Sequence, residues 1–203
     1  MTTPDGTTPL PFASVDALDS WLAGHPAPYP GLWVKVAKKD SGVPSVSWED
    51  VNDVALCHGW ITGQRRSLDE TYYLQRITPR RRGSQWSMVN VRRVAELEAA
   101  GRMRSAGRAE VAAARADGRW AVAYESQRNA TVPDDLAAAL ERSPGARAAF
   151  DRLGKTDRFL VGLRLQRTRT ARGRASRLAA EVARLEAQGT TEAMEAEETT
   201  EAE

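Results

Sequence analysis

The sequence predicts an α+β fold: a small antiparallel sheet with packed helices, followed by an all-helical C-terminal part. Three observations support this prediction. Apolar residues recur at helical spacing near the N-terminus, alternate at strand spacing in the segments 31–38 and 72–78, and return to helical spacing from residue 133 onward. The hydrophobic share of 41%, much of it Ala, is sufficient for a core and favours helices.

Four regions are expected along the 203 residues. Residues 1–11 are predicted to be a flexible leader, 12–130 the α+β core domain, 131–189 a helical Arg-rich module and 190–203 a disordered acidic tail. Six of the 27 acidic residues are Glu in that tail, so the chain before it is more basic than the net charge of +2 suggests. Such a basic body can attract anions, or the tail can mask it.

The first half of the core domain alternates helix and strand. Residues 12–23 read as an amphipathic helix that Ser14 can cap, and residues 31–38 alternate as a strand. Residues 47–57 form the next predicted helix, with Ser47 as its cap and two acidic residues in its first turn.

A hairpin and more helices are expected next. Residues 72–78 are a clear strand that Pro79 ends because proline cannot donate to the ladder, and residues 61–66 are expected to pair with it. Helices are then predicted over 88–100, with Ser84 or Ser87 as cap, and over 106–116. Further helices are predicted to begin at Pro133, Ser143 and Lys155.

The stretch from residue 55 to residue 90 holds the most informative residues. It contains the only Cys, one of the two His and two of the six Trp. It reads Ala-Leu-Cys-x-Gly-Trp-Ile-x-Gly from residue 55, Thr-Pro-Arg from residue 78, and Ser-x-Trp-Ser-x-x-Asn from residue 84. A segment this rich in aromatic, basic and turn-forming residues is where we expect a ligand.

These three motifs, in this order and spacing, resemble the YdeI/OmpD-associated family, also called the bacteriocin-protection family. The resemblance extends over roughly residues 12–188 and implies a helical C-terminal module whose Arg-rich segment is 168–177. It also implies an association with tolerance to antimicrobial peptides and with outer-membrane protein partners, but no reaction. His58 stands where the family often has an aromatic residue, and Thr62 stands where Asp is common.

The first functional hypothesis is a non-enzymatic cytoplasmic binding or stress-tolerance protein with a basic, Trp-walled pocket. From residue 71 to residue 95 there are six Arg and no acidic residue, beside a predicted helix start whose free amides favour anions. The pocket would take an anionic or aromatic small molecule or a partner peptide. The candidate ligand-binding residues are His58, Trp60, Arg76, Arg80, Ser84, Trp86, Ser87 and Asn90. A solvated basic loop and a structural His58 are the open alternatives.

The second hypothesis is nucleic-acid binding. A second window from residue 158 to residue 180 holds seven Arg and no acidic residue, although no helix-turn-helix or RNA-binding signature is present. The candidate residues are Arg81, Arg82, Arg167, Arg169, Arg172 and Arg174.

The third hypothesis is an enzyme that uses Cys57, His58 or a tyrosine hydroxyl. The sequence supplies no complete set of nucleophile, base and orienting group, so we assign no catalytic residue. It also shows no metal-ligand spacing and no Gly-rich phosphate loop, so we expect neither a metal nor a cofactor. A single Cys and the lack of a long apolar run or secretion signal lead us to expect a cytoplasmic protein without a transmembrane segment.

Overall fold

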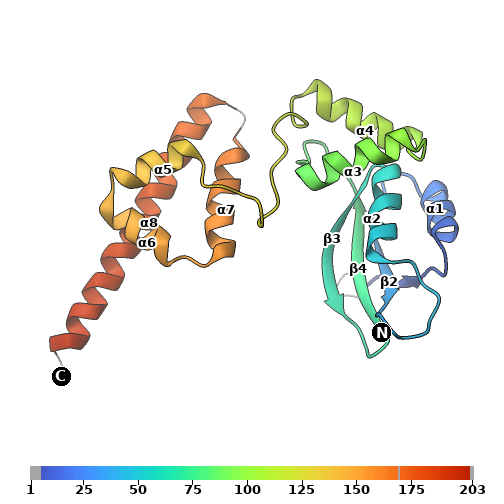
Figure 1. Ribbon diagram of the computed structural model, residues 1–203, viewed down its shortest axis with the longest axis horizontal. Coiled ribbons are helices and arrows are strands. Elements are labelled where there is room, and N and C mark those ends of the chain that lie inside the picture. Colours follow the sequence, from blue (N-terminus) through green and yellow to red (C-terminus); the bar gives the residue numbers. More distant parts are fainter. Residues whose placement is uncertain (1–5, 169, 202–203) are drawn as a thin grey trace. The chain divides into compact units, whose positions relative to one another are not determined.

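The computed structural model describes residues 6–168 and 170–201, and from residue 191 onward it describes the backbone alone. The chain forms two compact units, Met1–Ala123 and Tyr124–Glu203. The first unit holds the sheet, and the elements described in the second unit are helices (Figure 1). The predicted boundary after residue 130 therefore lies inside the N-terminal segment of the second unit.

The first unit is built on a four-stranded sheet of order β1-β2-β4-β3. Its central pairs are antiparallel, as predicted, and the α+β class is confirmed. The sequence did not predict β1, a two-residue strand inside the expected leader that pairs with β2 in parallel. Two residues are too short to show any alternation, so only the contact with β2 defines this strand. The strands are β1 (Leu10–Pro11), β2 (Leu32–Ala37), β3 (Trp60–Ser67) and β4 (Tyr72–Pro79).

Two helices pack against the sheet (Figure 1). These are α1 (Val15–Gly24) and α2 (Trp48–Cys57). The predicted caps are confirmed: the Ser14 hydroxyl accepts from the amide of Ala17, and Ser47 forms a reciprocal capping box with Asp50. The core between sheet and helices consists of Phe12, Leu18, Leu22, Leu32, Val34, Val36, Val46, Val51, Val54, Ala55, Trp60, Tyr73 and Ile77.

A second hydrophobic cluster lies under α3 (Met88–Ala99) and α4 (Ser105–Ala116). Ser87 caps α3 by accepting from the amide of Asn90, whereas the Ser84 hydroxyl accepts from the amide of Arg81 in the preceding loop. Of the two caps that the sequence allowed, Ser87 is therefore the one used. The cluster consists of Leu56, Cys57, Trp86, Val94, Leu97, Met103, Val111 and Ala114.

The end of α2 and the start of α4 touch backbone to backbone. A Cβ atom on Gly107 would lie 2.2 Å from the carbonyl oxygen of Cys57, so only glycine fits there. The amide of Arg104 donates to that same Cys57 oxygen over 3.0 Å. Gly59 follows with a φ of +74°, and a Cβ there would lie 3.0 Å from the Ala106 oxygen. These contacts hold the first turn of α4 beside the junction between α2 and β3.

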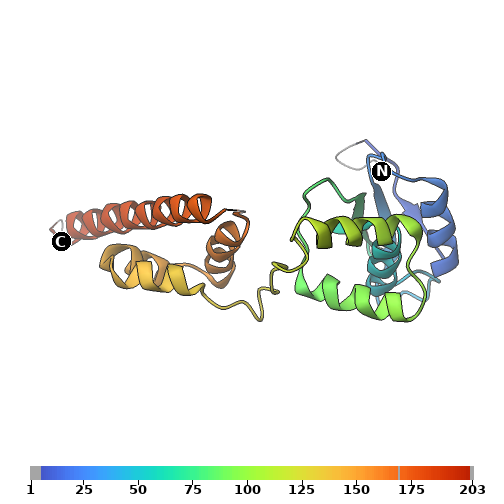
Figure 2. The same cartoon turned by 90° about the horizontal axis from the view of Figure 1, so that it is seen from above.

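The described part of the second unit contains four helices (Figure 2). They are α5 (Asp134–Glu141), α6 (Pro144–Arg152), α7 (Lys155–Gln166) and α8 (Ala171–Glu201). Their starts agree with the predicted positions at Pro133, Ser143 and Lys155. The core of this unit consists of Leu136, Leu140, Ala146, Ala149, Phe150, Val161, Leu165 and Leu185.

The last helix differs from the prediction for the C-terminus. The acidic segment 190–203 was expected to be disordered, but α8 continues through it to Glu201, and residues 202–203 lie outside the described part of the chain. The physical reason is composition, because Ala and Glu are strong helix formers and the helix is already nucleated by the packed residues before them.

The α2–α4 contact gives the first testable prediction. Gly107→Ala should lower the free energy of unfolding by about 3 kcal/mol, the upper end for overpacking, because the new methyl meets a backbone atom that cannot rotate away. Denaturant titration followed by circular dichroism measures this change. Gly24→Ala is the matched control, since nothing lies within 4 Å of its Cβ position and we expect little change. Equal stability of the two variants would show that the helices do not cross this closely.

Candidate functional site

A cavity of about 1000 Å³ lies in the first unit, beside the start of α4. Four parts of the chain form it: the second half of α1 with the loop after it, the α2–β3 junction, the end of β4, and α4 with the loop before it. Its charged and aromatic lining residues are Asp19, His58, Trp60, Arg80, Arg104, Arg108 and Glu110. The close α2–α4 contact therefore positions one wall of this cavity.

Three guanidinium groups face this space. Arg80 is only 6% exposed, lies 3.4 Å from the centre of the Trp86 ring and donates to the carbonyl oxygen of Gln85. This stacking on a buried indole fixes the direction of the Arg80 side chain. Arg104 and Arg108 come from the start of α4, where Arg108 donates to the carbonyl oxygen of Met103.

The first turn of α4 adds positive partial charge to the same wall. Arg104 occupies the cap position and makes no side-chain capping hydrogen bond. The first-turn residues Ser105 and Ala106 line the cavity. Amides at such a helix start have no partner within the helix and favour an anion.

A three-residue polar network closes one side of the cavity. His58 Nε2 lies 2.9 Å from Asp19 Oδ1, and Arg104 donates to both oxygens of Asp19, over 3.3 and 2.7 Å. Burial alone would raise the pKa of Asp19, but hydrogen bonds from Arg104 and His58 together hold that pKa below its usual value. His58 is thus engaged with a carboxylate across the cavity wall, which fits the structural reading of this residue.

The charges that line the cavity nearly balance. Arg80, Arg104 and Arg108 stand against the carboxylates of Asp19 and Glu110. Among these guanidinium and carboxylate groups the lining therefore has an excess of one positive charge. This balance fits an anion of low charge better than a polyanion, because two fixed carboxylates would repel the latter.

Three of the sequence-predicted ligand residues, His58, Trp60 and Arg80, line this cavity. The prediction that Trp60 and Trp86 form two walls of one pocket is wrong. Trp60 and Trp86 are each 1% exposed and belong to two different hydrophobic clusters, so they do not face each other across one recess. Burying an indole ring removes a large apolar surface from water, and both rings therefore lie in hydrophobic cores.

The remaining candidates lie elsewhere. Arg76 donates to the carbonyl oxygen of Pro30 over 2.7 Å and lies 5.5 Å from the centre of the Trp33 ring. Ser84 stays in the loop before α3, and Ser87 and Asn90 form the α3 cap. These four residues do not line the cavity.

Sequence reasoning missed Asp19, Arg104 and Arg108. The ion pair between Asp19 and Arg104 spans 85 positions, and nothing in the local sequence around either residue signals it. Arg104 and Arg108 are four residues apart at the start of a predicted helix, and this spacing could have indicated a shared basic face.

The enzyme hypothesis receives little support from Cys57. This thiol is 2% exposed, and burial raises its pKa, so it stays protonated and is a poor nucleophile. Among the residues that the structure describes, no group of three or more His, Cys, Asp or Glu could hold a metal ion.

Two family models match separate parts of the chain. Residues 129–188 match the family model described as "Bacteriocin-protection, YdeI or OmpD-Associated". This match supports the expected family over the C-terminal part of the chain. Residues 10–110 match a second model, described as a domain of unknown function (DUF8412), so the motifs between residues 55 and 90 lie in this second match. No curated protein and no solved structure gave a match.

Two arginines of the predicted Arg-rich window, Arg164 and Arg174, form ion pairs within the second unit. Arg174 forms a two-pronged pair with Asp135, over 2.7 and 2.9 Å, and Arg164 pairs with the buried Glu181. Arg167 and Arg172 are exposed, and Arg169 lies outside the described residues.

In the window from residue 71 to residue 95, Arg93 forms a two-pronged pair with the buried Asp53 of α2, whereas Arg81 and Arg82 are exposed. A window without acidic residues in sequence therefore meets acids from other elements in space.

Within the described part of the chain, no helix is long and apolar enough to cross a membrane.

The polar network around Asp19 gives a prediction on acid stability. The pKa of Asp19 is lower in the folded protein than in the unfolded chain. The Asp19 carboxylate therefore stabilises the fold above about pH 4, and this stabilisation is lost as the pH falls through the folded-state pKa. Asp19→Asn should therefore lower the free energy of unfolding by ~1 kcal/mol near neutral pH. This deficit should shrink below about pH 4.

Urea titrations at several pH values measure the deficit, with Glu70→Gln at an exposed position as the control. A deficit that does not depend on pH would contradict the role given to the Asp19 carboxylate.

Proposed function

We propose that the protein is a non-enzymatic binding protein of the bacteriocin-protection type, which takes up a singly charged organic anion in the cavity of its first unit. One observation carries the proposal: Arg80, Arg104 and Arg108, which come from β4's end and α4's start, line a single cavity. A small carboxylate, a sulfonate or the acidic end of a peptide is the class of ligand that these guanidinium groups recognise.

The walls of the cavity also suit the apolar part of such a ligand. Exposed apolar side chains, those of Ala23, Pro26 and Ala27, line it alongside the charged groups. An aromatic ring can therefore lie against apolar surface while its acidic group meets the guanidinium groups and the first-turn amides of α4.

The nucleic-acid alternative is less well supported by this arrangement. Binding to a phosphate backbone needs many free cations along one surface. Arg93, Arg164 and Arg174 from the two Arg windows are already held by carboxylates of the same unit. Arg80 is buried against Trp86.

The link to tolerance rests on the family to which the C-terminal domain belongs. A protein that holds an organic anion or the acidic end of a peptide can lower its free concentration or dock a partner, and either action suits a protective role. The expected cytoplasmic location remains a prediction, which fractionation of expressing cells would test.

Ligand binding is tested with naphthalene-2-sulfonate as a rigid aromatic monoanion. Isothermal titration should show one site per chain, and Arg108→Gln should weaken binding about tenfold because one charge-assisted hydrogen bond is lost. Arg108 is exposed, so this variant should keep its stability. Arg82→Gln, in an exposed loop outside the cavity, is the matched control and should bind like the wild type. Equal affinity of the two variants would overturn the assigned site.

The protective role is tested in cells. A bacterial strain that lacks its own copy should regain tolerance to a bacteriocin when it expresses the wild-type chain or Arg82→Gln. It should regain less with Arg108→Gln at the same protein level. Full protection by Arg108→Gln would separate the protective role from this cavity.

A further inference from the structure

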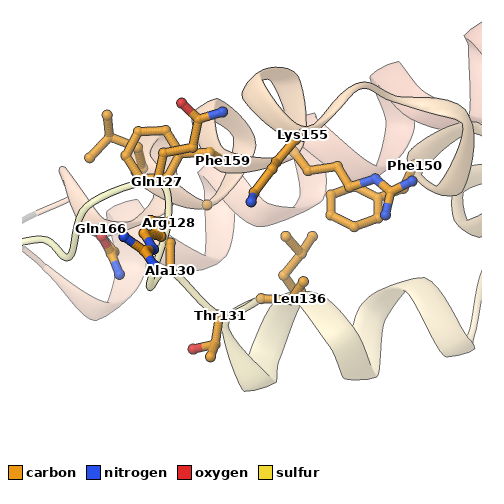
Figure 3. Close-up of a pocket in the computed structure, with 13 residues that line it drawn as sticks. Gln127, Arg128, Ala130, Thr131, Leu136, Phe150, Lys155, Phe159 and Gln166 are labelled. Atoms are coloured by element: carbon orange, nitrogen blue, oxygen red, sulfur yellow. The ribbon is translucent and has the colours of Figure 1, made fainter.

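The bacteriocin-protection domain contains a second cavity, of about 440 Å³, that none of the predicted site residues lines. It lies between the segment that leads into α5, the end of α6 and one side of α7. Figure 3 shows its lining residues. The cavity falls within the size range of small-molecule sites.

The floor of this cavity is apolar. Leu136, Phe150 and Leu163 are 0%, 4% and 7% exposed, and Phe159 from α7 is partly buried beside them. Hydrocarbon of a ligand would therefore meet side chains that also form the core of the domain.

The rim, in contrast, is cationic. Arg128, Lys155 and Arg158 are exposed at its edge, and none of the 13 described residues that line the cavity is acidic. In Figure 3 the Lys155 side chain extends into the space above Leu136, between Phe150 and Phe159. Because Lys155 is the first residue of α7, its charge adds to the positive helix start.

The charge at the rim is not neutralised within the described residues. Arg158 donates from Nε to the carbonyl oxygen of Leu153 over 2.9 Å and from Nη2 to that of Asp151, and both acceptors are backbone atoms. These bonds fix the guanidinium at the rim, 5.9 Å from the centre of the Phe150 ring, without cancelling its charge. Lys155 and Arg128 form no salt bridge in the described part of the chain. The cavity thus combines an apolar floor with three cations that form no salt bridge within the described residues.

We propose that this cavity binds an amphipathic organic acid, with its hydrocarbon chain on the apolar floor and its carboxylate at Lys155 and Arg158. The occupant is a free, monomeric alkyl carboxylate of medium length. The charge pattern excludes a cationic amphiphile, because three positive groups at the rim would repel it. This site is independent of the arginine-lined cavity in the first unit and uses other residues.

The test is isothermal titration of the full chain with decanoate below its micelle concentration. Decanoate should bind at one site in the second unit, and the affinity of this site should rise by about fourfold for each added methylene from octanoate to dodecanoate. Decanol should bind at least about tenfold more weakly because it lacks the charge, and decyltrimethylammonium should not bind. If decanol binds as tightly as decanoate, the proposal is wrong.

Variants locate the site. Lys155→Gln should weaken decanoate binding by about threefold to tenfold, and Lys155→Arg should restore it. Two controls should leave decanoate binding unchanged. One is Arg142→Gln, at an exposed position of the same domain outside the cavity, and the other is Arg108→Gln in the first unit. Phe159→Ala is a second test of the site. It shortens the apolar floor without changing any charge, so it should reduce the increase in affinity for each added methylene.

Unchanged binding by Lys155→Gln would overturn the assigned site. Binding to vesicles of an anionic phospholipid without binding of monomeric decanoate would overturn the choice of ligand.

Discussion

The backbone contact between the end of α2 and the start of α4 is the constraint on which the first unit depends. Gly107 lets the two helices approach until the Cys57 carbonyl oxygen accepts from the Arg104 amide. This contact brings the α4 start to the cavity wall, with Arg104 and Arg108 facing Arg80 from the end of β4. The same approach buries Cys57, which removes it as a nucleophile and makes it a packing residue.

Much of the fold could be predicted from sequence, because local signals and long-range packing agree there. Ser14, Ser47 and Ser87 cap the helices that their positions indicated, and the alternating strands pair as an antiparallel set. Two features depended on distant contacts and were missed or misjudged. The two-residue β1 exists only through its pairing with β2, and α8 continues into the acidic segment because its packed first half nucleates it.

The candidate site was harder to predict, because its charges meet from distant parts of the sequence. His58, Trp60 and Arg80 were among the predicted residues and line one cavity, but Asp19 and the α4 arginines carry no local signal of their meeting. Arginine windows without acidic neighbours suggested a nucleic-acid surface, yet Asp53, Asp135 and Glu181 engage several of these groups in the folded units. Charge patterns in sequence describe composition, whereas a binding surface depends on which charges remain uncompensated after folding.

The most direct test of the central claim is an amide NMR map of the labelled protein titrated with naphthalene-2-sulfonate. If the arginine-lined cavity is the anion site, the largest shifts should fall on the first-turn amides of α4, from Ser105 to Gly107, and on residues 58–60 and 79–80. Gly107→Ala should abolish that pattern, because it displaces α4 from the wall. Shifts confined to the second unit, or none at saturating ligand, would contradict the account.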